Sequence, residues 1–103
     1  MERKALSRIT KISEQNLDRI AALKSSGYEP NDYIINQALD LLEKRDFRYK
    51  RVSKRRLDKI TKISDKALKR ISKLKLTGYE SNDYIIGLAL ELLEKKESKK
   101  NGR

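Results

Sequence analysis

The chain has 103 residues, of which 37% are hydrophobic and 40% are charged. It carries 26 Lys and Arg against 15 Asp and Glu, a formal net charge of +11, and neither Cys nor His occurs. A disulfide scaffold and a thiolate metal site are therefore excluded, and the length suits about one domain. Since no apolar run is long enough for a signal peptide or a membrane-spanning helix, we expect a soluble, cytoplasmic protein with no membrane partner.

The first element along the chain is predicted to be a short extended strand that ends in Ile-Thr-Lys-Ile, residues 9–12. These mostly β-branched side chains favour a strand. Leu6, Ile9 and Ile12 are also spaced three apart, so one long helix through Ile12 is the competing interpretation. Ser13 argues against that helix, because it stands where the next helix needs a capping residue.

A first helix is predicted from about residue 14 to residue 26. Leu17, Ile20 and Leu23 form one apolar stripe at helical spacing. Gly27 follows, and glycine tolerates the positive φ with which many helices end. The helix is therefore expected to stop just before this glycine.

A second helix is predicted to open at Pro30 and to close near Lys44 and Arg45. Asp32 lies in its first turn, where the helix dipole favours an acid. Its apolar side chains cover a wide face and are Ile34, Ile35, Ala38, Leu39, Leu41 and Leu42. Because this face is too broad for a single partner helix, we expect the second helix to be the central element of the fold.

The whole pattern then occurs a second time. Residues 5–46 align with residues 56–97 at a constant offset of 51, and 25 of the 42 aligned positions are identical. Lys95 and Lys96 are expected to close the second copy. The sequence thus divides into a first repeat (residues 5–46), a basic linker (47–55), a second repeat (56–97) and a basic tail (98–103).

Each repeat is too small to bury a core alone, so the two are expected to pack together as one domain. The strand of each repeat has no sheet to join unless it pairs with the strand of the other. The predicted fold is therefore mostly α, with a two-stranded antiparallel ribbon.

The positive charge is concentrated around the linker. Residues 44–56 hold eight basic residues and one acidic residue. A solvated basic linker would explain such a cluster, but its density favours a polyanion, and in particular double-stranded DNA. The candidate phosphate-binding residues here are Arg48, Lys50, Arg51, Lys54 and Arg55.

Strand, helix, glycine turn and helix, repeated in a basic chain, resemble the ribbon–helix–helix family of DNA-binding proteins (the Arc and MetJ type). The residues that carry the resemblance are those of Ile-Thr-Lys-Ile-Ser, the Leu17 stripe, Gly27-Tyr28, residues 31–35 and Ala38-Leu39. The family is normally homodimeric, so the resemblance implies a tandem, single-chain pseudo-dimer whose ribbon enters the DNA major groove. It further implies a transcriptional repressor, or a plasmid accessory protein of the conjugative relaxosome or of partition. Cooperative self-association on adjacent sites, and a relaxase as partner, are then further candidates.

Strand alternation suggests which side chains read bases. If Ile12 and Ile63 point inward, the residues that face DNA are Ser7, Ile9, Lys11, Asp58, Ile60 and Lys62. A ribbon shifted by one residue would instead present Arg8, Thr10, Lys59 and Thr61. The strands differ at Ser7/Asp58 and at Arg8/Lys59, which predicts a DNA site whose halves are imperfect inverted repeats.

The family resemblance also implies that the N-terminus of the second helix in each repeat contacts phosphate. The residues at that place are Asn31, Ser81 and Asn82. The competing interpretation is that Asn-Asp only caps the helix.

The composition also bears on two other classes of function. Catalysis is disfavoured, because the chain has no His, no Cys and no glycine-rich phosphate loop, so no catalytic residue, metal site or cofactor is predicted. A helical-bundle protein-interaction module with a basic surface is the main alternative to DNA binding.

Overall fold

The computed structural model of the chain describes residues 8–44 and 57–102. The elements are β1 (Arg8–Ile12), α1 (Glu14–Leu23), α2 (Asn31–Glu43), β2 (Lys59–Ile63), α3 (Asp65–Leu74) and α4 (Asn82–Gly102). The described part of the chain is thus mostly helical with one two-stranded antiparallel sheet, as the sequence predicts. The linker at residues 47–55 lies outside the described residues.

Strands β1 and β2 pair across the two repeats. Thr10 lies opposite Thr61, so each repeat contributes the same residue to the centre of the ribbon. The alternative of one helix through Ile12 is wrong. Ser13 stops it, because its backbone is extended and its Oγ accepts a hydrogen bond from the backbone N–H of Asn16, which caps α1.

Helix α1 ends earlier than predicted, at Leu23 rather than at residue 26. The chain becomes extended at Lys24 (φ −74°, ψ 126°), whose N–H still reaches the carbonyl of Ala21. Gly27 has the positive φ expected of it, 86°, but it lies inside the following loop and not at the helix end. There the backbone turns around a carboxylate, as described below.

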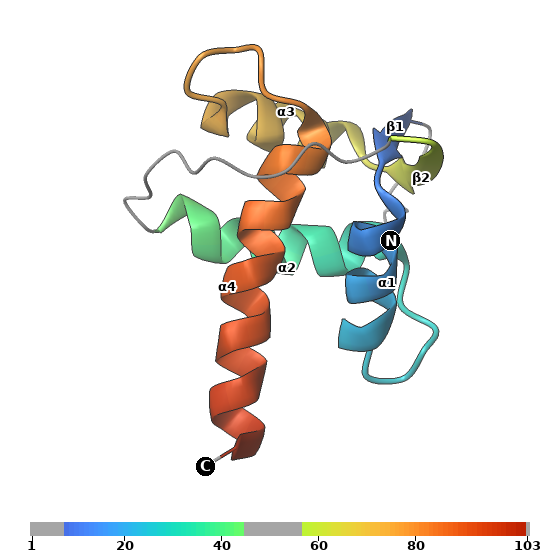
Figure 1. Cartoon of the computed structure of the whole chain (residues 1–103), viewed down its shortest axis with the longest axis vertical. Coiled ribbons are helices and arrows are strands. Elements are labelled where there is room, and N and C mark those ends of the chain that lie inside the picture. The colour runs from blue at the N-terminus through green and yellow to red at the C-terminus, as the bar shows by residue number, and fades with distance from the viewer. Residues whose placement is uncertain (1–7, 45–56, 103) are drawn as a thin grey trace, which may run out of the picture.

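Helices α2 and α4 share the most extensive contact among the described elements. In Figure 1 they cross near the middle of the molecule, with α1 and α3 on either side and the ribbon at one edge. Their predicted apolar faces form much of the core, in which each buried Ile or Leu contributes roughly 1.5–3 kcal/mol. The fully buried members include Ile34, Ile35, Leu39, Ile85, Ile86 and Leu90.

Helix α4 is longer than predicted. It spans 21 residues, against 13 in α2, and continues beyond Lys95 and Lys96 through Gly102. Lys and Glu, which dominate this segment, are good helix formers. The predicted tail therefore extends the helix up to Gly102, and Figure 1 shows that end of α4 projecting beyond the other elements. Over the described ranges, no helix has the length and apolarity needed to cross a membrane.

Candidate nucleic-acid interface

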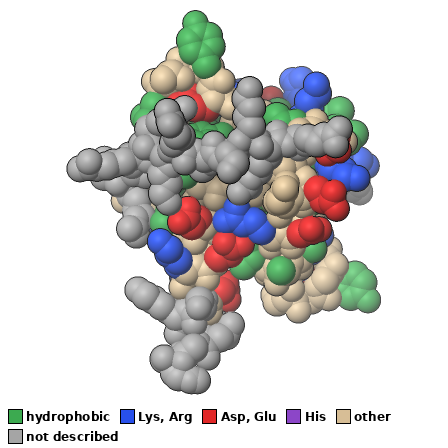
Figure 2. Space-filling model, viewed as in Figure 1, with side chains coloured by type: hydrophobic (Ala, Val, Ile, Leu, Met, Phe, Trp, Pro, Cys, Tyr) green, Lys and Arg blue, Asp and Glu red, His purple; other side chains and the backbone are tan. Residues whose placement is uncertain are grey.

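The outer face of the β1–β2 ribbon combines exposed aliphatic and basic side chains. Ile9 and Ile60 each keep 60% of their surface exposed, and Lys11 and Lys62 are exposed beside them. Ile9 lies opposite Lys62, and Lys11 lies opposite Ile60. Figure 2 shows basic and apolar side chains side by side at the ribbon end of the molecule. Two isoleucines this exposed on one face of a strand pair form a surface suited to a partner.

The inner face of the ribbon carries the other set of predicted residues. Thr10 and Thr61 are buried, with 7% and 6% of their surface exposed. Arg8 and Lys59, at the strand ends, remain exposed, and Arg8 lies 3.4 Å from Asp65. A ribbon shifted by one residue would therefore have to read DNA with two buried threonines.

The buried threonines contact the helix N-termini of the opposite repeat. Asn31 Nδ2, at the start of α2, donates a 2.7 Å hydrogen bond to Thr61 Oγ1. The Thr61 hydroxyl lies 3.4 Å from the carbonyl of Lys62, to which it donates. The start of α2 is thus connected to an exposed lysine of β2 by two hydrogen bonds.

The second repeat makes the same connection to the first. Asn82 Nδ2 donates to Thr10 Oγ1 at 2.9 Å, and the Thr10 hydroxyl donates to the carbonyl of Lys11 at 3.4 Å. We call these two chains of hydrogen bonds the Asn–Thr–Lys relays. In each relay, the asparagine side chain that the sequence assigns to phosphate donates to a threonine instead. What these helix ends can then offer an anion is chiefly the first backbone N–H groups of α2 and α4, because helices leave such groups without an intrahelical acceptor. The third N–H of each helix is already used, since Tyr33 donates to the carbonyl of Pro30 and Tyr84 to that of Ser81.

Ser81 has a capping role. Its Oγ accepts a 3.1 Å hydrogen bond from the backbone N–H of Tyr84, in the first turn of α4. Pro30, at the same place before α2, makes no side-chain cap. The capping interpretation therefore describes Ser81 better than it describes Asn31 or Asn82.

The acids next to these asparagines point into the protein. Asp32 and Asp83 are buried, with 3% and 4% of their surface exposed. Asp32 Oδ1 accepts hydrogen bonds from the backbone N–H (2.9 Å) and the hydroxyl (3.0 Å) of Ser64, the residue that caps α3. The sequence suggests for these acids only roles in their own helix, as a partner of its dipole or as part of an Asn-Asp cap. That the same Ser and Asp recur in both repeats was the available signal, but it does not show that they meet across repeats.

The loops that lead into α2 and α4 each wrap around a glutamate. The Glu29 carboxylate accepts hydrogen bonds from the backbone N–H groups of Ser25, Ser26 and Gly27 at 3.1–3.2 Å. Hydrogen bonds from its own backbone N–H and from that of Ser26 lower the pKa of Glu29 to about 2. This carboxylate, rather than the end of α1, shapes the loop around Gly27.

The loop of the second repeat is built in the same way. Burial opposes ionisation of Glu80, but hydrogen bonds from its own backbone N–H and from that of Thr77 outweigh it and lower its pKa to about 2. Tyr28 and Tyr79, beside these glutamates, are 92% and 93% exposed.

Other predicted site residues are distributed as follows. Asp58 is exposed just before β2. The residues that lie outside the described part of the chain are Ser7, Arg48, Lys50, Arg51, Lys54 and Arg55. The structure thus brings together the strand residues and the starts of α2 and α4.

Comparison with known proteins yields no relative. No family model matches the chain, and no curated protein or solved structure matches it.

Proposed function

We propose that this chain is a sequence-specific double-stranded DNA-binding protein, a single-chain pseudo-dimer of the ribbon–helix–helix type. The β1–β2 ribbon enters the major groove, and the starts of α2 and α4 lie against the phosphates on either side. The observation that carries the proposal is the exposed pair Ile9 and Ile60, set among lysines on the outer face of a two-stranded ribbon.

The chemistry of this face suits base edges. A two-stranded ribbon fits the major groove, where thymine presents a methyl group and guanine presents the O6 and N7 acceptors. Ile9 and Ile60 can contact the methyl groups, and Lys11 and Lys62 can donate to guanine. A purely electrostatic contact with DNA would not need the exposed isoleucines.

The pairing register divides these four residues into two equal sets about the central threonines. One side of the ribbon presents Ile9 with Lys62, and the other presents Ile60 with Lys11. Similar sets favour a site with two related halves. The strand ends differ, Arg8 against Lys59, so the two halves are expected to be related but not identical.

In the cell, such a protein acts as a transcriptional repressor, or assists a plasmid relaxosome or partition complex. Its partner is double-stranded DNA, with further copies of itself on adjacent sites and a relaxase as candidates. The net charge of +11 supports binding to a polyanion in any of these roles.

The test is a selection of binding sites from a random double-stranded DNA library, followed by titration of the selected duplex and a scrambled duplex of equal composition. We expect one enriched motif with two related halves. With roughly 6 to 10 phosphate contacts, affinity should fall about 10³- to 10⁵-fold between 50 and 200 mM salt. Equal affinity for both duplexes, or an affinity that does not change with salt, would refute the proposal.

A further inference from the structure

The two repeats differ at matching positions within their mutual interfaces. Asn16 on α1 corresponds to Ala67 on α3, and Asn36 on α2 corresponds to Gly87 on α4. Helix α1 packs against α4, and α3 packs against α2. Each of these two helix pairs therefore holds one of the two asparagines, from α1 in the first pair and from α2 in the second.

In the pair of α1 and α4, the carboxamide of Asn16 connects an acid to a base. Its Nδ2 donates to Asp83 Oδ1 at 2.7 Å and to the Asp83 carbonyl at 3.1 Å. Its Oδ1 accepts from Arg19 Nη1 at 2.9 Å. Arg19 then binds both carboxylate oxygens of Glu94 at 2.8 Å.

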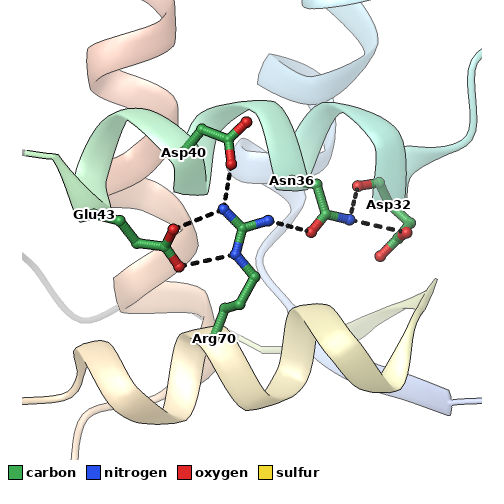
Figure 3. Close-up of polar contacts among 5 residues, drawn as sticks. All are labelled: Asp32, Asn36, Asp40, Glu43 and Arg70. Atoms are coloured by element: carbon green, nitrogen blue, oxygen red, sulfur yellow. Dashed lines mark hydrogen bonds and ion pairs between the residues drawn. The ribbon is translucent and has the colours of Figure 1, made fainter.

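In the pair of α2 and α3, the carboxamide of Asn36 makes equivalent contacts from the opposite helix (Figure 3). Its Nδ2 donates to Asp32 Oδ2 at 3.0 Å and to the Asp32 carbonyl at 2.8 Å. Its Oδ1 accepts from Arg70 Nη1 at 2.8 Å. Arg70 also binds both oxygens of Glu43 and a carboxylate oxygen of Asp40. Both interfaces thus hold one carboxamide between an aspartate and an arginine.

The space around Gly87 admits only one such group. A Cβ added at Gly87 would lie 3.3 Å from Asn16 Nδ2 and 3.6 Å from its Oδ1. Asn16 is fully buried and held by hydrogen bonds, so it has little freedom to retreat. Two asparagines in one helix pair would therefore be overpacked, and a pair with none would leave its aspartate and arginine without their bridge.

We infer that this exchange of one carboxamide makes each repeat pair with the other repeat and disfavours pairing with a copy of itself. Two first repeats would bring Asn16 and Asn36 together in both helix pairs, whereas two second repeats would combine Ala67 with Gly87. The partner that fits each interface is therefore the unlike repeat. This selection keeps the unlike strands β1 and β2 side by side, whatever the ribbon binds.

A double-mutant cycle in the full chain tests the steric part of the inference. We expect Asn16→Ala to lower the melting temperature by roughly 4–16 °C, and Gly87→Asn to lower it by a similar amount. The double variant reproduces the Ala and Asn arrangement of the other interface and should melt within about 3 °C of the original chain. The mirror variant, Ala67→Asn with Asn36→Gly, should be tolerated for the same reason. Losses that simply add in both double variants would overturn the inference.

A cysteine at the centre of the ribbon tests pairing itself. The chain has no Cys, and residue 10 would face residue 10 only if two first repeats paired, at a spacing that allows a disulfide. Chains carrying Thr10→Cys are refolded at about 1 mM, where pairing between chains competes with pairing within one chain, and are then oxidised. The original background should give no disulfide-linked dimer, because an unlike pairing, within or between chains, places residue 10 opposite Thr61. Adding Asn16→Ala and Gly87→Asn makes both repeats alike at these positions, and disulfide-linked dimers should then form.

Two controls complete the experiment. Thr10→Cys with Thr61→Cys in the original background should form the bond within one chain, which establishes that the ribbon geometry supports it. Equal yields of disulfide-linked dimer from Thr10→Cys in the original and the altered background would overturn the inference.

Discussion

Asp83 Oδ1 accepts a 2.8 Å hydrogen bond from the backbone N–H of Ser13, a residue 70 positions earlier in the chain. The Ser13 hydroxyl donates to the same oxygen at 3.0 Å and accepts from Asn16 N–H, which caps α1. The start of α4 in one repeat therefore fixes the start of α1 in the other. Asp32 at the start of α2 accepts the same two hydrogen bonds from Ser64, which caps α3. Each repeat therefore supplies the aspartate that holds the capping serine of the other repeat.

Replacing Asp83 by Asn should destabilise the protein by about 2–3 kcal/mol. The buried carboxylate accepts from several donors, whereas a carboxamide has only one acceptor oxygen, a weaker one, and an NH₂ group that donates. Urea unfolding followed by far-ultraviolet circular dichroism measures the change. Asp18→Asn, an exposed change of the same chemistry on α1, should cost less than about 0.5 kcal/mol. If both variants lost the same small amount of unfolding free energy, the connection between Asp83 and Ser13 would not stabilise the fold.

Thr61→Val should lower the affinity ratio of the selected duplex to the scrambled duplex by roughly 2- to 10-fold, because the relay from Asn31 to Lys62 loses both its hydrogen bonds. Valine keeps the shape and the strand preference of threonine. Fluorescence anisotropy titration at one fixed salt concentration measures the ratio.

Thr61→Ser is the matched control, since it keeps the hydroxyl. It should restore most of the ratio, while both variants bind scrambled duplex about as the original chain does. If valine and serine reduced the ratio equally, the hydroxyl would have no role in positioning Lys62.

The fold should lose stability on acidification in the window set by Glu29 and Glu80. Their pKa values are lowered to about 2 from an ordinary value of 4.5, so their ionised forms stabilise the folded state above about pH 4.5. This contribution is lost progressively as pH falls toward 2.

The double variant Glu29→Gln with Glu80→Gln should therefore melt below the original chain at pH 7, and the two melting curves should converge near pH 2. Glu14→Gln, an exposed change on α1, is the control and should leave most of the pH dependence in place. A constant difference in melting temperature from pH 7 to pH 2 would show that the carboxylate charges are not responsible.

Much of the fold could be predicted from the sequence because its determinants are local and occur twice. Ser13 and Ser64 cap helices within three residues of themselves, and the alternation of Ile12 with its neighbours sets the buried face of the strand. The pairing of β1 with β2 followed from the lack of any other strand in the predicted elements.

The contacts that could not be predicted are those between repeats. Asn31 and Asn82 lie where a phosphate contact is expected. Nothing near them in the sequence indicates that their side-chain amides donate to threonines instead. The early end of α1 depends on how the loop wraps Glu29, a tertiary arrangement rather than a helix preference. Predicting either feature would require knowing which atoms from separate segments of the chain lie in contact.

The central claim is that the outer face of the β1–β2 ribbon reads base edges, and one comparison tests it most directly. The variant Lys11→Ala with Lys62→Ala is titrated against selected and scrambled duplexes beside Lys95→Ala with Lys96→Ala, which removes equal charge from exposed positions on α4. With each base contact worth about 1–3 kcal/mol, the ribbon variant should lower the affinity ratio of selected to scrambled duplex about 30-fold or more. The α4 variant should leave this ratio unchanged. Equal losses of the ratio in both variants, or no loss in the ribbon variant, would contradict the account.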